Sequence, residues 1–338
     1  LESPQNATVS LGAHYDLLYK SGILVNYKKK QLLTNNDQFS LDVILGDNFR
    51  YNLNYFVDNG FYISYGFRSR YNHFRDDVRF DLTALDNPNI SNINLNFSDI
   101  TNQLYFQTTF SRKFAIGIGA EHKYISATTR TLTVNDEATV LDQSSYFNTF
   151  GYMKLDTYDK KYFVTKGFYA DLNFRWFMGS TDYNNNFSPF SQARGTLGVA
   201  TTLFDRFTFQ VTNEVGLTFN SPESNVFDYY LGGYNQNYIN NFIPFYGLDF
   251  SDRSNDSFVK ATANLRYRMG EKQYLSFIAN YARLDDNVFR DIEPFKNTVF
   301  GYAVGYSLDT FIGPIELKYS WSPDSNQNFW LFNLGFWF

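Results

Sequence analysis

The strongest constraint on this chain is a strict alternation of apolar and polar side chains in segments that also carry charge. Residues 257–269 read SFVKATANLRYRM, and this period of two is typical of a β-strand with two unlike faces. The apolar face carries Val259, Ala261, Ala263, Leu265 and Tyr267, and the polar face carries Lys260, Thr262, Asn264, Arg266 and Arg268. A row of three cations facing lipid would cost several kcal/mol near the membrane midplane. The polar face must therefore point into a hydrated interior.

The same alternation recurs along the whole chain. It predicts sixteen strands, near 7–18, 21–30, 37–46, 48–57, 60–71, 102–112, 114–126, 145–157, 166–178, 191–204, 206–219, 257–269, 272–283, 297–309, 313–321 and 328–338. Each is about as long as a strand that crosses a bilayer at a tilt. An open sheet this rich in exposed Phe and Tyr would have edges that aggregate, and closure removes them. We therefore predict an all-β fold, a 16-stranded antiparallel transmembrane β-barrel, forming one domain over residues 1–338.

Short and long connections alternate from the fifth predicted strand onward. Tight turns are expected at 112–113, 205–206, 270–272 and 309–313, and long connections at 72–101, 127–144, 179–190, 220–256, 284–296 and 322–327. Outer-membrane barrels have short periplasmic turns and longer external loops. The alternation therefore places both termini in the periplasm. Only residues 1–6 look like a leader into the first strand.

The longest interruption is the sixth external loop, residues 220–256. A connection of this length is unusual unless the loop has a function. Its middle is rich in Tyr, Phe and Asn, and Gly232, Gly233 and Gly247 allow positive φ. We expect this loop to fold back into the lumen of the barrel.

Composition excludes several other classes of protein. The net charge of −5 argues against a nucleic-acid partner, and the absence of cysteine excludes disulfide and thiolate chemistry. No apolar run reaches the roughly 18 residues of a helical membrane span. The first residues do not read as a secretion signal, so we expect a mature form or a fragment.

Candidate catalytic groups are sparse. There is no G-x-S-x-G motif, and the three histidines, His14, His73 and His122, are far apart in the sequence. Asp156 and Asp159 could serve acid–base chemistry or bind calcium, but a structural turn is the favoured interpretation. Asp285 and Asp286 are interpreted as a solvated pair. We therefore expect no catalytic residue, metal site or cofactor in this chain.

The last ten residues, FWLFNLGFWF, end on Phe338. The simplest interpretation is a final apolar strand that closes the barrel against the first. A terminal aromatic residue on an alternating strand is also typical of a barrel assembly signal. We therefore assign that role to Phe338, with the barrel-assembly machinery of the outer membrane as a partner.

Three segments carry a resemblance to a known family. Residues 301–323, GYAVGYSLDTFIGPIELKYSWSP, are similar to the C-terminal strands of the bacterial surface-antigen superfamily, which includes BamA-type insertases, two-partner-secretion transporters and patatin-like autotransporters. Residues 155–172 are similar to its D-x-x-D…F-x-T-x-G signature, with Asp156, Asp159, Phe163, Thr165 and Gly167, and residues 231–233 match its LGG. The resemblance implies an outer-membrane location in a Gram-negative bacterium and a lumen-inserted sixth loop.

The chain departs from the family at the loop tip. The family tip usually reads V-R-G-Y/F, and here it reads Phe245, Tyr246, Gly247, Leu248. The strand that usually supplies an aspartate to the family's arginine has Asn280 instead. A buried charge without its partner is costly, whereas two neutral polar groups can still hydrogen-bond. We therefore predict that Tyr246 and Asn280 are neighbours, with Arg266 and Arg268 also facing the lumen.

The tip sequence FYGLDF looks most like the patatin-like branch. The resemblance implies a translocator or anchor domain, with outer-membrane lipid, an N-terminal passenger domain and a second copy of the chain as expected partners. Gly12 and Gly335 would weaken the seam between the first and last strands, where a client could pass. The alternatives are a passive or ligand-specific porin, a pure membrane anchor and a soluble carbohydrate-binding β-protein.

Overall fold

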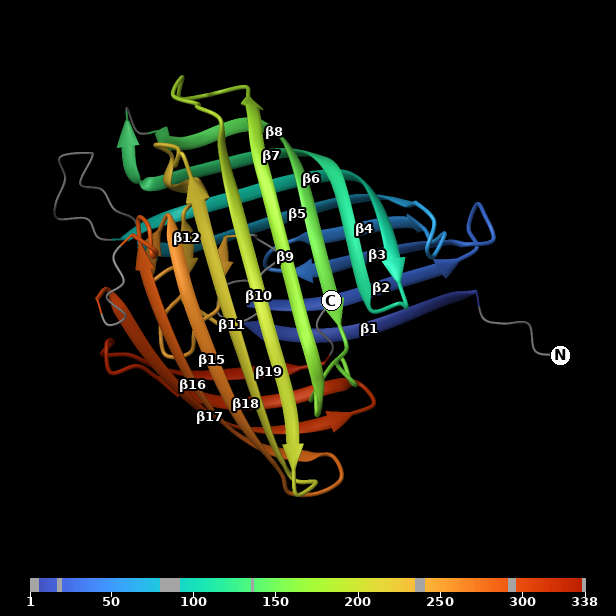
Figure 1. The fold of residues 1–338 in the computed structure, drawn as a ribbon. Helices are drawn as coiled ribbons and strands as arrows, with labels where there is room; N and C mark the ends of the chain where they lie inside the picture. The colour runs from blue at the N-terminus through green and yellow to red at the C-terminus, as the bar shows by residue number, and fades with distance from the viewer. Residues whose placement is uncertain are drawn as a thin grey trace.

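A computed structural model describes residues 6–16, 20–79, 92–134, 137–234, 241–290 and 296–335. Sixteen strands form one antiparallel sheet in which each strand pairs with its neighbours along the chain (Figure 1). The sheet curls into a nearly closed barrel. The predicted fold class, an all-β 16-stranded antiparallel barrel, is therefore confirmed. The described residues contain no helix long and apolar enough to cross a membrane.

The strands of the barrel lie close to the predicted ranges. They are β1 (Ala7–Asp16), β2 (Lys20–Lys30), β3 (Asp37–Gly46), β4 (Arg50–Val57), β5 (Ser64–Arg79), β6 (Asn92–Phe110), β7 (Phe114–Val134), β8 (Glu137–Asp156), β9 (Gly167–Ser180), β10 (Phe190–Leu203), β11 (Phe207–Phe219), β15 (Ser257–Arg268), β16 (Gln273–Asp285), β17 (Thr298–Thr310), β18 (Gly313–Trp321) and β19 (Asn328–Leu334).

Two predicted loops are wrong in extent. The prediction placed connections at 72–101 and 127–144, but β5, β6, β7 and β8 extend through most of these ranges. Cross-strand hydrogen bonds continue there, for example from Asn94 to Asp77 at 2.9 Å. Polar side chains pair across the strands along these extensions, as expected where the sheet has left the membrane. The alternation of apolar and polar residues therefore stops before the strands end. The alternation of short and long connections consequently fails between β7 and β8.

The two faces of the sheet differ as predicted. On β15, Leu265 is 44% exposed on the outward face, whereas Lys260 and Arg266 are each only 6% exposed on the inward face. On β9, Phe168, Leu172, Phe174 and Trp176 all point outward. Inside, Glu214 accepts hydrogen bonds from Lys260 at 2.6 Å and from Arg194 at 3.1 Å. These two cations of the inner wall are therefore neutralised by Glu214 on the strand between them.

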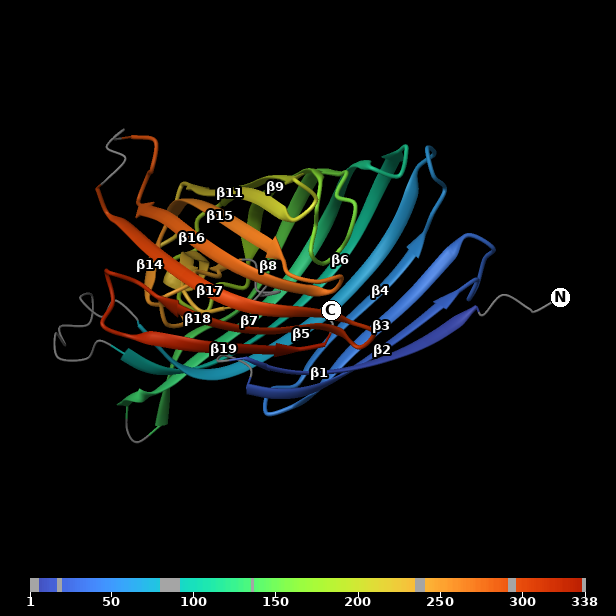
Figure 2. The same cartoon turned by 90° about the horizontal axis from the view of Figure 1, so that it is seen from below.

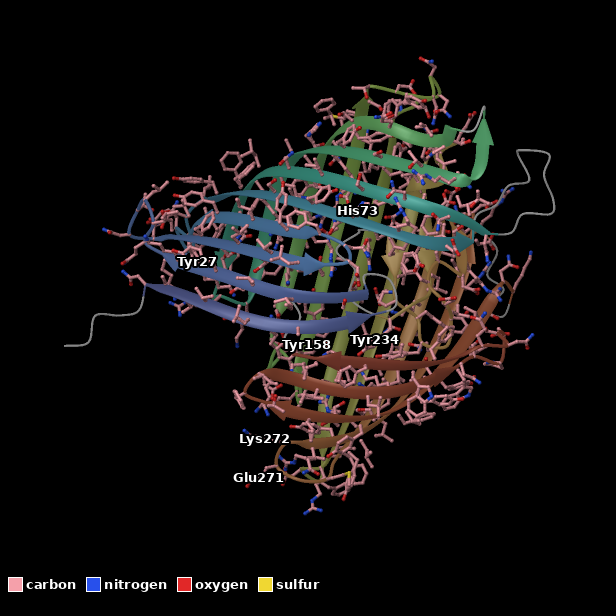
Figure 3. All side chains as sticks on the ribbon, turned by 180° about the vertical axis from the view of Figure 1, so that it is seen from behind. Tyr27, His73, Tyr158, Tyr234, Glu271 and Lys272 are labelled. Carbon is pink, nitrogen blue, oxygen red and sulfur yellow. The ribbon has the colours of Figure 1, made fainter. Side chains whose placement is uncertain are left out.

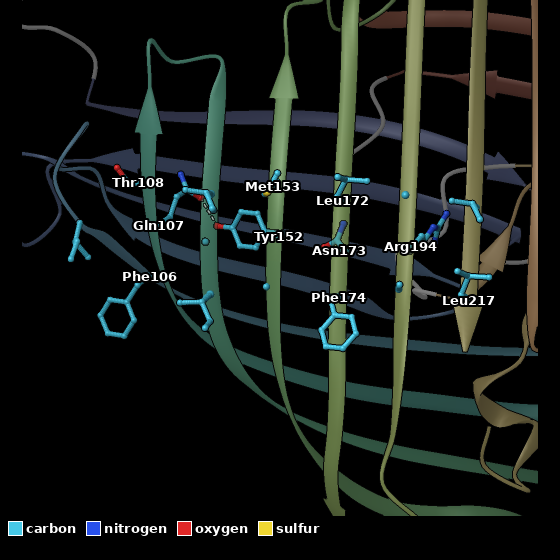
Figure 4. A pocket seen from close by; sticks show the side chains of 18 residues that line it. Phe106, Gln107, Thr108, Tyr152, Met153, Leu172, Asn173, Phe174, Arg194 and Leu217 are labelled. Carbon is cyan, nitrogen blue, oxygen red and sulfur yellow. Dashed lines mark hydrogen bonds between the residues drawn. The ribbon is translucent and has the colours of Figure 1, made fainter. Parts of the chain in front are cut away.

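The outward wall contains a shallow depression of about 770 Å³ over β6–β11 (Figure 4). Small residues, Gly151, Ala193 and Gly195, form its floor, and Phe106 and Phe174 stand beside them. Register explains the shape, because Gly151 lies opposite Phe174 and Phe174 lies opposite Ala193. Small and large side chains thus alternate across the strands on the face that meets lipid.

The two ends of the sheet meet at a seam. The ladder order begins at β1 and ends at β19, and these strands lie side by side (Figure 2). A side-chain carbon at Gly335 would lie 3.2 Å from the carbonyl oxygen of Ala13. Gly335 has a φ of +101°, a conformation that favours glycine. Among the described residues, no continuous ladder joins β1 to β19.

Candidate functional site

The connection between β11 and β15 has a fold of its own. It contains a 3₁₀ turn (Asn225–Phe227) and three short strands, β12 (Tyr229–Leu231), β13 (Phe242–Ile243) and β14 (Arg253–Asn255). β12 pairs in parallel with β13 and antiparallel with β14. The Asn241 amide donates to the carbonyl oxygens of Val226 and Asp228 at 2.9 and 2.8 Å, which joins β13 to the 3₁₀ turn.

Alternation within these short strands sends side chains toward two separate arcs of the barrel wall. Phe227, Tyr230, Phe242 and Phe250 of the loop pack with apolar side chains of β5–β10. Tyr229, Leu231, Ile243, Phe245 and Leu248 pack with Phe258, Ala282, Leu284 and Val299 of β15, β16 and β17. The rings of Phe242 and Phe250 lie 5.8 and 5.6 Å from that of Phe74 on β5, whereas Tyr229 meets Phe258 at 4.9 Å.

The tip of the loop, Phe245–Leu248, rests against β17 and β18. Phe245 and Leu248 are 1% and 2% exposed. A side-chain carbon at Gly301 of β17 would lie 1.9 Å from the carbonyl oxygen of Tyr246. Gly247 has a φ of +87°, and a side chain there would meet the carbonyl oxygen of Trp321 at 2.3 Å. Glycine is therefore needed on both sides of this contact.

The hydroxyl group of Tyr246 in the tip and that of Tyr234 earlier in the loop both contact Lys318 of β18. The Lys318 ammonium donates to the hydroxyl of Tyr234 at 2.9 Å and to that of Tyr246 at 3.4 Å, and it pairs with Glu316 at 2.9 Å. Tyr234 donates in turn to Glu316 at 3.1 Å. The ammonium lies 4.9 and 5.7 Å from the centres of the Tyr234 and Tyr246 rings, within the range of a cation–π contact. Figure 3 marks Tyr234 within the outline of the barrel.

Asn280 lies next to this contact on β16. It is directly opposite Gly301, the residue that the Tyr246 carbonyl touches. Its Oδ1 accepts a hydrogen bond from Thr262 at 3.0 Å, while its buried Nδ2 has no hydrogen-bond partner within the described parts of the chain. The hydroxyl of Tyr246 points to Lys318, and the predicted contact between Tyr246 and Asn280 stays a prediction.

The two other predicted lumen residues occupy different places. Arg266 is buried and donates to the carbonyl oxygen of Val164 in the connection between β8 and β9. Arg268 is exposed at the end of β15, where it donates to the carbonyl oxygen of Asp205 at 2.7 Å. Phe338 lies outside the described residues. The predicted turn at Asp156 and Asp159 is present, and both carboxylates accept backbone hydrogen bonds within it.

Sequence reasoning missed Lys318. It belongs to the segment LKYSW, whose alternation places it on the polar face with Glu316 and Ser320. The signal that could have identified Lys318 is the chemistry of the loop tip. Once the family's arginine is absent from the tip, a cation on the wall can meet the tyrosine that replaces it, and Lys318 is the lysine on the strand beneath that tip.

Comparisons with known proteins agree with this architecture. A family model described as the OMP85 superfamily matches residues 1–338. A search of curated protein sequences found no match.

Three solved structures share the fold. BamA from Haemophilus ducreyi, lacking POTRA domains 1–3, is similar with a TM-score of 0.69 and 13% identity over 98% of this chain and 70% of that chain. CdiB from Escherichia coli gives 0.66 and 11% over 99% and 63%, and CdiB from Acinetobacter baumannii gives 0.62 and 13% over 99% and 60%. The chain thus spans less than two thirds of either CdiB. The chain belongs to the OMP85 superfamily and is a Gram-negative outer-membrane β-barrel.

Proposed function

We propose that this barrel is the translocator or anchor domain of a surface-antigen-type protein, with the loop 220–256 folded into its lumen. The supporting observation is that the loop packs on two arcs of the inner wall at once, through β5–β10 and through β15–β17. A loop that bridges both arcs obstructs the channel between them. Such a barrel needs another route or a triggered opening for a client, whereas a porin needs a clear channel.

The first experiment separates a plugged barrel from a porin by single-channel recording in planar bilayers. We expect low, flickering conductance for the parent protein and higher conductance when residues 230–250 are deleted. Deletion of the exposed residues 184–186 in the β9–β10 connection is the control and should leave conductance low. A large, steady conductance in the parent protein would instead identify a porin.

The second experiment tests translocation through the seam. Because the chain has no cysteine, thiols at Ala13 and Leu334 can be bridged by a short cross-linker without background. An epitope tag placed ahead of Leu1 reports surface exposure on intact cells. We expect the tag to reach the surface in the unbridged protein and to stay inside when the seam is bridged. A tag that never reaches the surface identifies an anchor, and equal exposure in both states rules out the seam as the route.

The finer assignment within the superfamily is the patatin-like branch. It is supported by the tip sequence FYGLDF, and it implies a lipid acyl hydrolase domain with a G-x-S-x-G motif upstream in the full gene product. Sequencing the gene upstream of Leu1 tests this directly. The barrel-assembly machinery, recruited through Phe338, is the proposed partner during insertion, and truncation of Phe338 is expected to lower the yield of assembled barrel.

A second copy of the chain is a further proposed partner. The apolar depression over β6–β11 offers a face on which two barrels could pair. A thiol at Gly151 tests this, because a symmetric pair would cross-link in membranes and a barrel surrounded by lipid would not.

A further inference from the structure

The connection between β8 and β9, residues 157–166, folds inward rather than standing clear of the sheet. It contains ten residues, whereas the other connections at the same end, 31–36, 58–63, 111–113, 204–206, 269–272 and 311–312, contain two to six. Phe163 and Val164 are buried, although both belong to a turn at the rim. A turn that merely reversed the chain would not need to bury a phenylalanine.

The connection first crosses the inner face of β10. The hydroxyl of Tyr158 lies so close to Gly198 that a side-chain carbon at that position would meet it at 2.3 Å. Farther along, Thr202 donates from its hydroxyl to the carbonyl oxygen of Thr165 at 2.7 Å. Gly198 and Thr202 share the inward face of β10. Tyr158 is labelled in Figure 3.

The connection then reaches β15 and β16. The ring of Phe163 stacks on that of Tyr274 with centres 4.5 Å apart and planes inclined by 15°. The guanidinium of Arg266 lies 5.6 and 5.5 Å from the centres of these two rings. Arg266 also donates to the carbonyl oxygen of Val164. A segment that starts at β8 is therefore held on the far side of β10 and β11.

Local hydrogen bonds shape the connection for this reach. The Asp159 carboxylate accepts from the backbone N–H groups of Thr165 and Lys166 at 2.8 and 3.1 Å. Burial raises the pKa of Asp159, but the hydrogen bond from the Thr165 hydroxyl, together with these two backbone hydrogen bonds, outweighs burial and holds the pKa below its ordinary value. Phe163 has a φ of +50° and Gly167 one of +124°. A left-handed phenylalanine is a strained residue, and its strain accompanies the inward turn of the ring.

Arg266 is held in a way that permits release. Within the described residues, no carboxylate lies within 4 Å of its guanidinium, and its Nε has no hydrogen-bond partner. Its direct contacts are two aromatic faces and one carbonyl group, and the carboxylates of Glu316 and Asp159 act on its charge from beyond that distance. If the turn leaves, Arg266 faces the hydrated lumen, and no carboxylate in direct contact with it loses its partner. The Lys318–Glu316 pair beneath the loop tip lies entirely on β18, so it stays together whether or not the loop leaves.

We propose that residues 157–166 are a second plug, which closes the periplasmic end of the lumen, with Arg266 as the positioning residue that latches it. The loop 220–256 then obstructs the external half and this turn the periplasmic half. The purpose of such a latch rests on the proposed translocation function, but the closure itself does not. A client or partner that displaces Phe163 from Arg266 would open the periplasmic entrance.

Thiol accessibility tests the latch. Val164→Cys keeps the backbone carbonyl that Arg266 contacts and puts one thiol into a chain without cysteine. We expect Arg266→Gln to increase the rate at which a bulky maleimide labels this thiol at least ten-fold. Lys272→Gln removes one positive charge from an exposed turn at the same end and should leave the rate unchanged. Equal rates in the parent and Arg266→Gln proteins would overturn the proposal.

Conductance supplies an independent readout. With two plugs in series, Arg266→Gln alone should change conductance little, and deletion of 230–250 should open the barrel only in part. The combined variant should conduct more than the deletion variant does. No further gain over the deletion alone means that the turn is not a plug. If Arg266→Gln increases the labelling of the Val164→Cys thiol while the N-terminal tag stays inside the cell, the plug proposal stands and the translocation proposal fails.

Discussion

At the scale of single residues, Gly301 sets how closely the loop tip can approach the wall. A methyl group there would lie 1.9 Å from the carbonyl oxygen of Tyr246. We expect Gly301→Ala to push the tip away and to destabilise the barrel by about 1–3 kcal/mol, as overpacking usually does. Heat-induced loss of the compact band on semi-native gels measures the change. Gly179→Ala is the matched control, because a side-chain carbon there meets nothing within 4 Å.

Lys318 and Glu316 test whether the tip is held by charge. Lys318→Met removes the cation and leaves Glu316 without its ion-pair partner, which typically costs about 3–5 kcal/mol for a buried pair. We expect the double variant Lys318→Met, Glu316→Gln to recover most of that loss. Proteolysis of the loop and semi-native gels both report it. A double variant as unstable as the single one would show that the lost contacts of Lys318 with Tyr234 and Tyr246, and not the unpaired charge of Glu316, account for the loss.

The loop as an element responds to pH through Asp228. Burial, with the negative charges of Asp256 and Asp286 nearby, raises the pKa of Asp228 from 3.8 to about 7. The folded loop therefore keeps a proton between about pH 4 and 7 that the unfolded loop releases. Its stability is highest below that range, falls as pH rises through it, and stays low above it.

We expect the amides of Tyr229–Leu231 to be better protected from hydrogen exchange at pH 5 than at pH 8, after correction for intrinsic rates. The opening equilibrium should change roughly ten-fold or more, since one pKa unit corresponds to about 1.4 kcal/mol. Asp228→Asn should abolish this dependence and raise protection at pH 8. Unchanged pH dependence in that variant would place the titrating group elsewhere.

The strands and loops also show how much of the structure could be predicted from the sequence. The period of two placed all sixteen barrel strands because each has one face in lipid, and this pattern is local to each strand. It misplaced the ends of β5–β8, because pairing continues there after the lipid contrast has ended. The loop contacts were less accessible to sequence reasoning. That Tyr246 meets Lys318, seventy-two residues away, depends on how the loop folds and not on any local pattern.

For the whole molecule, the barrel is held in the membrane because the outer face of the sheet is apolar and the inner face is polar. Ala263 points to lipid in the middle of β15, and Asn264 beside it points inward. We expect Ala263→Arg to cost about 2–4 kcal/mol, as arginine does near the bilayer midplane, and Asn264→Arg to be tolerated better. The yield of barrel folded into liposomes measures both. Equal yields would mean that the outward face does not meet hydrocarbon.

The long strands on one side give the molecule a lopsided profile. β7 has 21 residues and β8 has 20, while β2 has 11 and β3 has 10, and about 9–11 residues suffice to cross a bilayer. At about 3.3 Å per residue, the surplus of roughly ten residues is some 30 Å long when measured along the tilted strands, so this flank projects farther than the strands beside the seam. On the outer side of the membrane, the β7–β8 flank therefore projects as a raised sheet, and the rim beside the seam is low. Antibodies and phage would encounter the projecting β7–β8 sheet first, and large extracellular particles would have easier access to the barrel on the low side.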